Sequence, residues 1–203
     1  MRWPFFMSRN ILAPFLITFV SNMQHFLPNG QTLEIRQAVP DDAPVLLSYF
    51  RQLISETDFL LYTREDAASW TVEDERDFIH SFSNHTKDLL LLAFAGHQPV
   101  GTLSIRQNTF SKEAHLCNLG IGVLHSYWNM GIGRRMMTAA TRWAEQHPQL
   151  EIIQLSVLAN NERAIQLYRN FGFMEYGRMQ KGIRQPDGSY VDNILMSKRV
   201  KPL

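Results

Sequence analysis

Two glycines with a helix directly behind them carry the clearest chemical signal in this 203-residue chain. Gly131 and Gly133 follow a run of strand-forming residues that ends at Val123, and apolar residues then recur at helical spacing over residues 132–143. The first turn of a helix has backbone N–H groups without partners and the positive end of the helix dipole. A glycine loop that leads into such a helix predicts an anion site, and we expect the anion to be a phosphate.

Two common phosphate-binding motifs do not fit these glycines. A P-loop requires G-x-x-x-x-G-K-[ST], and no Lys-Ser or Lys-Thr pair follows Gly133. A dinucleotide-binding fingerprint needs a third glycine within a repeated βαβ unit, and the sequence contains neither. These two classes of nucleotide-binding protein are therefore not predicted.

The glycine loop resembles the acetyl-CoA loop of the GCN5-related N-acetyltransferases, the GNAT superfamily. That loop has the pattern Gln/Arg-x-x-Gly-x-Gly/Ala after a strand that ends in valine. Here Val123 is followed by a short turn and then by Trp-Asn-Met-Gly-Ile-Gly over residues 128–133. Trp128 stands where Gln or Arg is usual, a departure that resembles a bacterial subgroup with Tyr-Trp before the glycines.

A second stretch, residues 152–173, resembles the strand and helix that follow the loop in the same superfamily. The shared features are a strand ending at Val157, then Asn161, Ala164, the pair Leu167-Tyr168 and the stop Gly172-Phe173. Two motifs in the correct order are more specific than either one alone. The resemblance covers about residues 32–198 and implies one acetyltransferase domain over residues 32–203.

The predicted fold is the GNAT fold, a mixed α/β (α+β) domain. The expected order is β-α-α-β-β-β-α-β-α-β-β, with a helix over residues 71–83 and a strand over residues 113–124 that enters the glycine loop. The resemblance implies a mostly antiparallel sheet with one parallel strand pair splayed open at the cofactor. Gly120 and Gly122 mark points where the strand before the loop bulges or is closely approached.

The resemblance implies an N-acetyltransferase that moves the acetyl group of acetyl-CoA to a primary amine by direct attack in a ternary complex, without a metal. The residues that it places at the cofactor are Ile121, Val123, Trp128, Asn129, Met130, Gly131, Ile132, Gly133, Arg134 and Asn161. The backbone of Ile121 and Val123 would bind the pantetheine arm, and the amides of residues 129–134 would bind the pyrophosphate. Asn161 has an alternative role as the cap of the following helix.

Tyr168 is the expected acid that protonates the departing CoA thiolate, because it occupies the position of the superfamily's matching residue. A phenol with an ordinary pKa near ~10 is protonated at neutral pH and can donate a proton. The alternative is a packed core tyrosine whose hydroxyl bonds to the backbone.

The general base is the point at which the sequence departs from the superfamily. Many relatives have Glu in the strand before the loop, whereas this chain has Asn118 there or beside it, and an amide side chain does not accept a proton. Glu56 and Glu113 are carboxylates that would replace it. His115 ranks lower because alternation puts it on the opposite strand face from Asn118. A water chain ordered by Asn118 would also serve.

The acceptor is only weakly encoded. The helices on the expected acceptor side are acidic, which favours a cationic amine but also fits a solvated helix face. The acidic residues are Glu56, Asp58, Glu65, Asp66, Glu73, Asp74, Glu75 and Asp77. Phe59, Leu60 and Tyr62, in a loop expected over residues 56–64, would form an apolar wall. Small amines, peptide N-termini and ribosomal-protein N-termini all remain open.

Two functions without acetyl transfer are alternatives. The missing strand glutamate fits a GNAT-fold sensor that binds CoA without catalysis, although Tyr168 argues against this function. The other alternative is a structural subunit paired with another acetyltransferase through the first thirty residues.

The composition is that of an ordinary domain without a strong charge. The chain has 20 Lys and Arg against 19 Asp and Glu, so no bulk field favours nucleic acid or a membrane as a partner. The single cysteine, Cys117, excludes a disulfide within one chain, and we expect it to be a buried, inert thiol. A reducing, cytoplasmic location is the expectation, because acetyl-CoA is found there.

Residues 1–31 form an N-terminal extension with three competing interpretations. An apolar run over residues 11–20 is too short to span a bilayer, and Pro14 interrupts it. The segment is an added element that covers an apolar patch, a poor signal or membrane-surface segment, or the product of a start codon placed too early. We expect it to pack on the domain or across a homodimer, away from Gly131, because the exposed run would be unfavourable in water.

Overall fold

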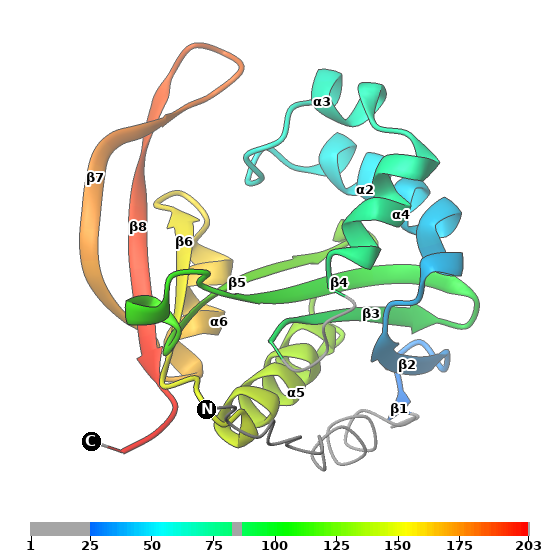
Figure 1. Cartoon of the computed structure of the whole chain (residues 1–203). Helices are drawn as coiled ribbons and strands as arrows, with labels where there is room; N and C mark the ends of the chain where they lie inside the picture. The colour runs from blue at the N-terminus through cyan, green and yellow to red at the C-terminus, as the bar shows by residue number, and fades with distance from the viewer. Residues whose placement is uncertain (1–24, 83–86, 203) are drawn as a thin grey trace, which may run out of the picture.

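The computed structural model describes residues 25–82 and 87–202. In these residues, eight strands form one sheet in the order β1-β2-β3-β4-β5-β6-β8-β7 (Figure 1). The strands are β1 His25–Phe26, β2 Thr32–Gln37, β3 Leu89–Ala95, β4 Gln98–Gln107, β5 Leu116–Val123, β6 Ile152–Leu158, β7 Met174–Arg184 and β8 Tyr190–Arg199. The helices are α2 Ala43–Glu56, α3 Arg64–Ser69, α4 Val72–His80, α5 Ile132–Gln146 and α6 Glu162–Asn170.

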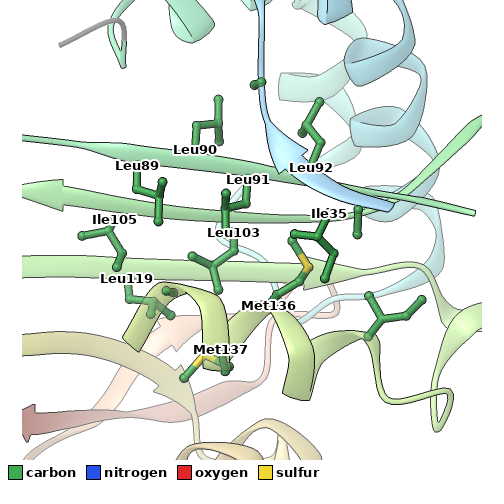
Figure 2. Packing of buried hydrophobic residues seen from close by; sticks show 14 of the residues in the cluster. Ile35, Leu89, Leu90, Leu91, Leu92, Leu103, Ile105, Leu119, Met136 and Met137 are labelled. Atoms are coloured by element: carbon green, nitrogen blue, oxygen red, sulfur yellow. The ribbon is translucent and has the colours of Figure 1, made fainter. Parts of the chain in front are cut away.

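Helices cover both faces of the sheet because its central strands are apolar on both sides. Every residue of β3, the run Leu-Leu-Leu-Leu-Ala-Phe-Ala, is buried, which is typical of a strand between two helical layers. Figure 1 shows α2, α3 and α4 on one side of the sheet and α5 on the other. Leu103 and Ile105 of β4 pack in the same cluster as Met136 of α5 (Figure 2).

The one parallel strand pair, β5 with β6, separates part of the way along its length. Three residue pairs join the strands, from Leu116↔Ile152 to Asn118↔Gln154. Beyond them β5 stays paired with β4 and β6 stays paired with β8. The other neighbouring strands are antiparallel. The predicted mixed sheet with a splayed parallel pair is therefore confirmed.

The strand that enters the glycine loop differs from its prediction in two details. It begins at Leu116 instead of residue 113, because the 3-10 turn η3 Ser111–Glu113 precedes it. Its pairing with β4 is regular from Gly101↔Val123 to Gln107↔Cys117, so Gly120 and Gly122 do not form a bulge. Of the two alternatives expected for these glycines, a bulge or a close approach, the bulge does not occur; a register shift lies instead between β3 and β4.

Close approach is the reason for glycine at position 122. A Cβ atom there would lie 2.6 Å from Leu53 Cδ2 and 3.1 Å from the Tyr49 hydroxyl oxygen, both on α2. The predicted buried thiol is also found in β5, where Cys117 is fully enclosed and burial raises its pKa to about 12.

The acidic helices of the chain begin with capping boxes. Thr63 accepts a hydrogen bond from the Asp66 N–H, and the Asp66 carboxylate accepts one from the Thr63 N–H, so α3 starts where a loop was expected to end. Thr71 and Asp74 repeat the arrangement at the start of α4. Two of the acidic residues are therefore helix caps.

The predicted N-terminal extension lies mostly outside the described residues, including its apolar run over residues 11–20. Its last residues are described: β1 pairs antiparallel with β2, with His25 opposite Leu33. Between these strands the Gly30 N–H donates a hydrogen bond to the Leu27 oxygen and forms a turn. Within residues 25–82 and 87–202, no helix is long and apolar enough to cross a membrane.

Candidate active site

A cleft of about 740 Å³ opens where β5 and β6 separate. Its walls are residues 119–123 of β5, residues 156–158 of β6, the loop before α5 and one side of α6. The cleft therefore occupies the space that is left where the two strands do not pair.

The backbone of β5 presents hydrogen-bonding groups to this cleft. The Leu124 N–H donates to the Val100 oxygen, and the residues that bond across an antiparallel ladder alternate along each strand. Even-numbered residues of β5 therefore bond to β4. The N–H and C=O groups of Leu119, Ile121 and Val123 point the other way, towards the cleft.

The same alternation holds on the opposite wall. The Ala159 N–H donates to the Asp192 oxygen, so the odd-numbered residues at the end of β6 bond to β8. The backbone groups of Ser156 and Leu158 consequently face β5 across the cleft. An extended ligand with amide groups can bind between the two walls as an added strand does.

The N-terminus of α5 forms one end of the cleft. Gly131, the N-cap residue, has φ +80° and no atom within 4 Å of the position of a Cβ, so glycine is needed there for its backbone conformation. The first helical bond runs from the Arg135 N–H to the Gly131 oxygen. The N–H groups of residues 132–134 therefore have no partner within the helix, and these residues line the cleft.

Trp128 fastens this loop to the end of β5. Its indole N–H donates to the Val123 oxygen at 2.8 Å. The guanidinium of Arg163, on α6, lies 4.6 Å from the centre of the Trp128 ring and donates to the Asn129 side-chain oxygen at 3.0 Å. Trp128, which departs from the usual pattern, thus stabilises the position of the loop. Arg163 is a cation at the cleft that the sequence analysis did not identify.

Of the predicted cofactor residues, nine line the cleft and one does not. Met130 is partly buried against the hydrophobic core instead. Asn161 lines the cleft and also caps α6, since its side-chain oxygen accepts the Ala164 N–H at 3.1 Å. The two roles considered for Asn161 are therefore compatible.

Tyr168 lies in the wall of the cleft on α6. The residue is 6% exposed, and burial raises its pKa to about 12, so the phenol keeps its proton at neutral pH. Its ring is 5.9 Å from that of Phe173, and its hydroxyl has no hydrogen bond to another described residue. The geometry is that of a proton donor that is not already engaged.

The residues considered as general bases lie outside the cleft lining. The Asn118 amide donates to the Asn108 side-chain oxygen at 2.8 Å, and Glu113 accepts from the Asn108 amide at 3.0 Å. These three residues form a surface network at the start of β5.

Glu56 is held by another set of bonds at the end of α2. One carboxylate oxygen accepts the His125 N–H at 2.7 Å, and the other accepts the Gln52 amide at 2.8 Å. Glu56 therefore fixes the turn after β5, and it does not line the cleft.

A second, smaller cavity of about 210 Å³ lies between the sheet and the helices α2 and α4. We call it the acceptor pocket, because it contains part of the apolar wall that the sequence analysis expected for the acceptor. It shares Leu53, Leu60, Tyr62 and residues 120–122 of β5 with the cleft, so the two cavities meet at this strand. Of the predicted apolar wall, Leu60 and Tyr62 line both cavities, whereas Phe59 lines the cleft alone.

Comparison with known proteins gives a family. Residues 51–173 match the Acetyltransferase (GNAT) family. L-amino acid N-acetyltransferase AaaT of Escherichia coli (strain K12) is 27% identical over 108 residues, which are 53% of this chain and 66% of that protein. The Probable N-acetyltransferase san of Drosophila melanogaster is 31% identical over 86 residues, 42% of this chain and 47% of that protein. The chain thus spans about half to two thirds of these relatives.

Solved structures extend the match over most of the chain. An acetyltransferase of the GNAT family from Streptococcus pneumoniae has a TM-score of 0.78 at 29% identity, over 82% of this chain and 99% of that one. The putative acetyltransferase yncA from Salmonella typhimurium, solved with its cofactor acetyl-CoA, has a TM-score of 0.73 at 13% identity, over 84% and 95%; this likeness concerns the fold alone. Since the family match covers more than half of the sequence, the chain belongs to the Acetyltransferase (GNAT) family.

Proposed function

We propose that this protein is an N-acetyltransferase that transfers the acetyl group of acetyl-CoA directly to a primary amine in a ternary complex. The observation that carries the proposal is the meeting of two cavities at residues 120–122 of β5. A cofactor in the cleft and an amine in the acceptor pocket would meet at these shared residues. Direct attack needs this arrangement, because the reacting atoms must come within about 3–3.5 Å of each other.

The cleft suits acetyl-CoA along its length. The free N–H groups at the start of α5 and the charge of Arg163 would bind the pyrophosphate. The pantetheine arm, which contains amides, would pair with Ile121 and Val123 on one wall and with Ser156 on the other. The yncA structure was solved with acetyl-CoA bound, which supports acetyl-CoA as the cosubstrate of this protein.

The chain supplies two groups to the transfer itself. The amine nitrogen attacks the thioester carbonyl carbon, and a cleft-facing N–H of β5, such as that of Ile121, stabilises the oxyanion that forms. The C–S bond then breaks, and the sulfur takes the hydroxyl proton of Tyr168. The acceptor ammonium loses one proton to solvent before the attack, and the nitrogen loses a second proton to solvent as the amide forms. Tyr168 recovers its proton from solvent.

Glu56 and Asn118 stay predictions for the base and for the residue that orders water. Neither lines the cleft, and both side chains are engaged elsewhere. We therefore favour loss of the amine proton to water before attack, a route that needs no carboxylate at the reacting atoms.

The test is acetyl transfer by the full-length chain. Acetyl-CoA is incubated with panels of diamines, amino acids and peptides with free N-termini, and the release of free thiol is followed together with product mass. We expect transfer to nitrogen, as the names of the similar proteins suggest. Acetyl-CoA binding without transfer to any amine would favour the sensor function instead, and failure to bind acetyl-CoA would remove the cofactor assignment.

A further inference from the structure

Glu75 is a buried carboxyl group without a cationic partner among the described residues. It lies on α4, is 5% exposed and lines the acceptor pocket. No ion pair reaches it. The Trp70 indole N–H is close enough to lower the pKa of the carboxyl but does not meet hydrogen-bond geometry with it, and this buried N–H has no other partner among the described residues. Burial is the larger influence and raises the pKa to about 7.

Three other carboxylates of this region have partners, and the contrast makes Glu75 unusual. The buried Asp42 receives two hydrogen bonds from Arg36, both at 2.7 Å. The Asp74 carboxylate accepts the Thr71 N–H at the start of α4, and Glu73 forms an exposed ion pair with Arg76. A buried carboxylate is expensive unless it is paired, so an unpaired one in a cavity points to a partner that arrives from outside.

Three aromatic rings line the same pocket as this carboxyl group. Phe50, Tyr62 and Trp70, which we call the aromatic box, come from α2, from the following loop and from the end of α3. Their ring centres are 5.3 Å apart for Phe50 and Tyr62, 6.2 Å for Phe50 and Trp70, and 6.5 Å for Tyr62 and Trp70. Aromatic faces attract cations, and the attraction grows when water is excluded.

The pocket offers this cation site no competing charge. Among its lining residues Glu75 is the one with a formal charge; the others are apolar, aromatic or small, apart from Thr102 and Ser104. A carboxyl group beside an aromatic box in an otherwise neutral wall selects for an organic cation over an anion or a neutral polar group.

The position of Glu75 separates this cation from the nitrogen that is acetylated. Residues 120–122 of β5 line both cavities, whereas Glu75 and Trp70 line the acceptor pocket and not the cleft. The attacking nitrogen must reach the shared part of the wall. Glu75 is therefore placed for a different group of the same molecule.

We propose that Glu75 and the aromatic box bind a second cationic group of the acceptor. The acceptor class is then a compact molecule with a primary amine at one end and an ammonium or guanidinium group at the other, joined by a short apolar spacer that fits a pocket of about 210 Å³. This inference rests on the proposed acetyl transfer, because it assigns the acceptor of that same site.

The test is a binding measurement that does not require catalysis. The full-length chain is saturated with CoA and titrated in a calorimeter with α,ω-diamines from diaminopropane to diaminohexane and with the n-alkylamines of the same lengths. At least one diamine should bind roughly 10-fold or more tightly than its matched monoamine, the size expected for a charge-assisted contact. Glu75→Gln should remove this preference and leave the monoamine affinity unchanged.

Two further variants separate charge from structure. Glu73→Gln makes the same charge change on the exposed side of α4 and should keep the wild-type preference. Glu75→Asp shortens the side chain by one methylene group, so the preferred diamine should become longer by one carbon. This variant also tests the idea if Glu75→Gln does not fold.

Three results would overturn the proposal. The wild type could bind diamines no better than monoamines, Glu75→Gln could keep the preference, or it could weaken both ligand classes equally, which would assign Glu75 to the attacking nitrogen. Each of these leaves acetyl transfer intact if CoA still binds and amines are still acetylated. Loss of CoA binding in the wild type would instead count against the proposed function.

Discussion

The cofactor cleft and the acceptor pocket share one strand, but they are built from different parts of the chain. The cleft presents backbone groups without partners among the described residues: those of β5 and β6 where the strands separate, and the free N–H groups at the start of α5. The acceptor pocket is lined by side chains from α2, α4 and the segment between them. Main-chain groups do not depend on side-chain identity, so the cleft can bind the same ligand when side chains change. In the acceptor pocket a single substitution can change which ligand binds.

Glycine illustrates the difference, because it serves each cavity for a separate reason. Gly131 permits a left-handed backbone conformation beside the cleft, in open space. Gly122 permits close packing of α2 against β5 beside the acceptor pocket, with an ordinary backbone. Substitutions at these sites should therefore act through different causes, the loop conformation at Gly131 and the packing of α2 at Gly122.

The largest effect is expected for Tyr168→Phe in the cleft wall. Loss of the proton donor should lower kcat by roughly 10²–10⁴-fold, the usual contribution of general acid catalysis, with little change in the KM for acetyl-CoA. The fold should be retained, since the hydroxyl has no hydrogen bond to lose among the described residues. Single-turnover rates equal to those of the wild type would show that Tyr168 is a packing residue only.

Gly131→Val should weaken CoA binding by roughly 10-fold or more. A β-branched residue at φ +80° costs about 1–3 kcal/mol of backbone strain, which the loop can relieve by moving its N–H groups away from the pyrophosphate. Gly188→Val is the matched control, because Gly188 has φ +85° and equally open surroundings in the turn between β7 and β8. It should lose similar stability yet keep CoA affinity by calorimetry; equal affinities in both variants would contradict the assignment.

Gly122→Ala should act on the other cavity. Its new methyl group would lie 2.6 Å from Leu53 Cδ2, and overpacking of this kind typically costs about 1–3 kcal/mol. We expect a lower midpoint of urea unfolding than in the wild type. The KM for the acceptor should increase more than the KM for acetyl-CoA. In a double-mutant cycle with Leu53→Ala the two losses should be less than additive, because the smaller side chain leaves room for the methyl group.

The same contrast explains what the sequence could predict. The strand, the glycine loop and the helix of the cleft are consecutive, so local patterns in residues 119–146 and 152–173 indicate the elements and suggest the cofactor contacts that we propose for them. The splay followed from the resemblance, and the structure confirmed it.

The acceptor pocket could not be predicted in this way, because its walls come from segments far apart in the chain. In the sequence Glu73, Asp74 and Glu75 look alike, and only packing against α2 decides which of them turns inwards. One signal was present: Val72, Glu75 and Ile79 share the i, i+3, i+7 spacing of the apolar face of a helix. A carboxylate at such a position predicts a buried charge.

The smallest expected effect is on thermal stability, and it tests the buried state of Glu75. Burial raises the pKa of this carboxyl to about 7 from an ordinary value of about 4.5. Between these two pH values the unfolded chain has released the proton and the folded chain has not, so stability falls as the pH rises through this window. Above about pH 7 the loss is complete. A glutamine at this position does not titrate and should escape the loss.

The difference in Tm between Glu75→Gln and the wild type should therefore grow from pH 4.5 to pH 7 and then stay constant. Glu73→Gln, on the exposed side of α4, should show no such growth. A saturating diamine should remove this Tm difference at pH 8. The bound cation pairs with the ionised carboxylate of Glu75 and thereby stabilises the folded wild type. A difference that stays flat across the pH range would mean that solvent reaches the carboxyl, and the acceptor pocket would then lack the dry, unpaired charge that separates it from the cleft.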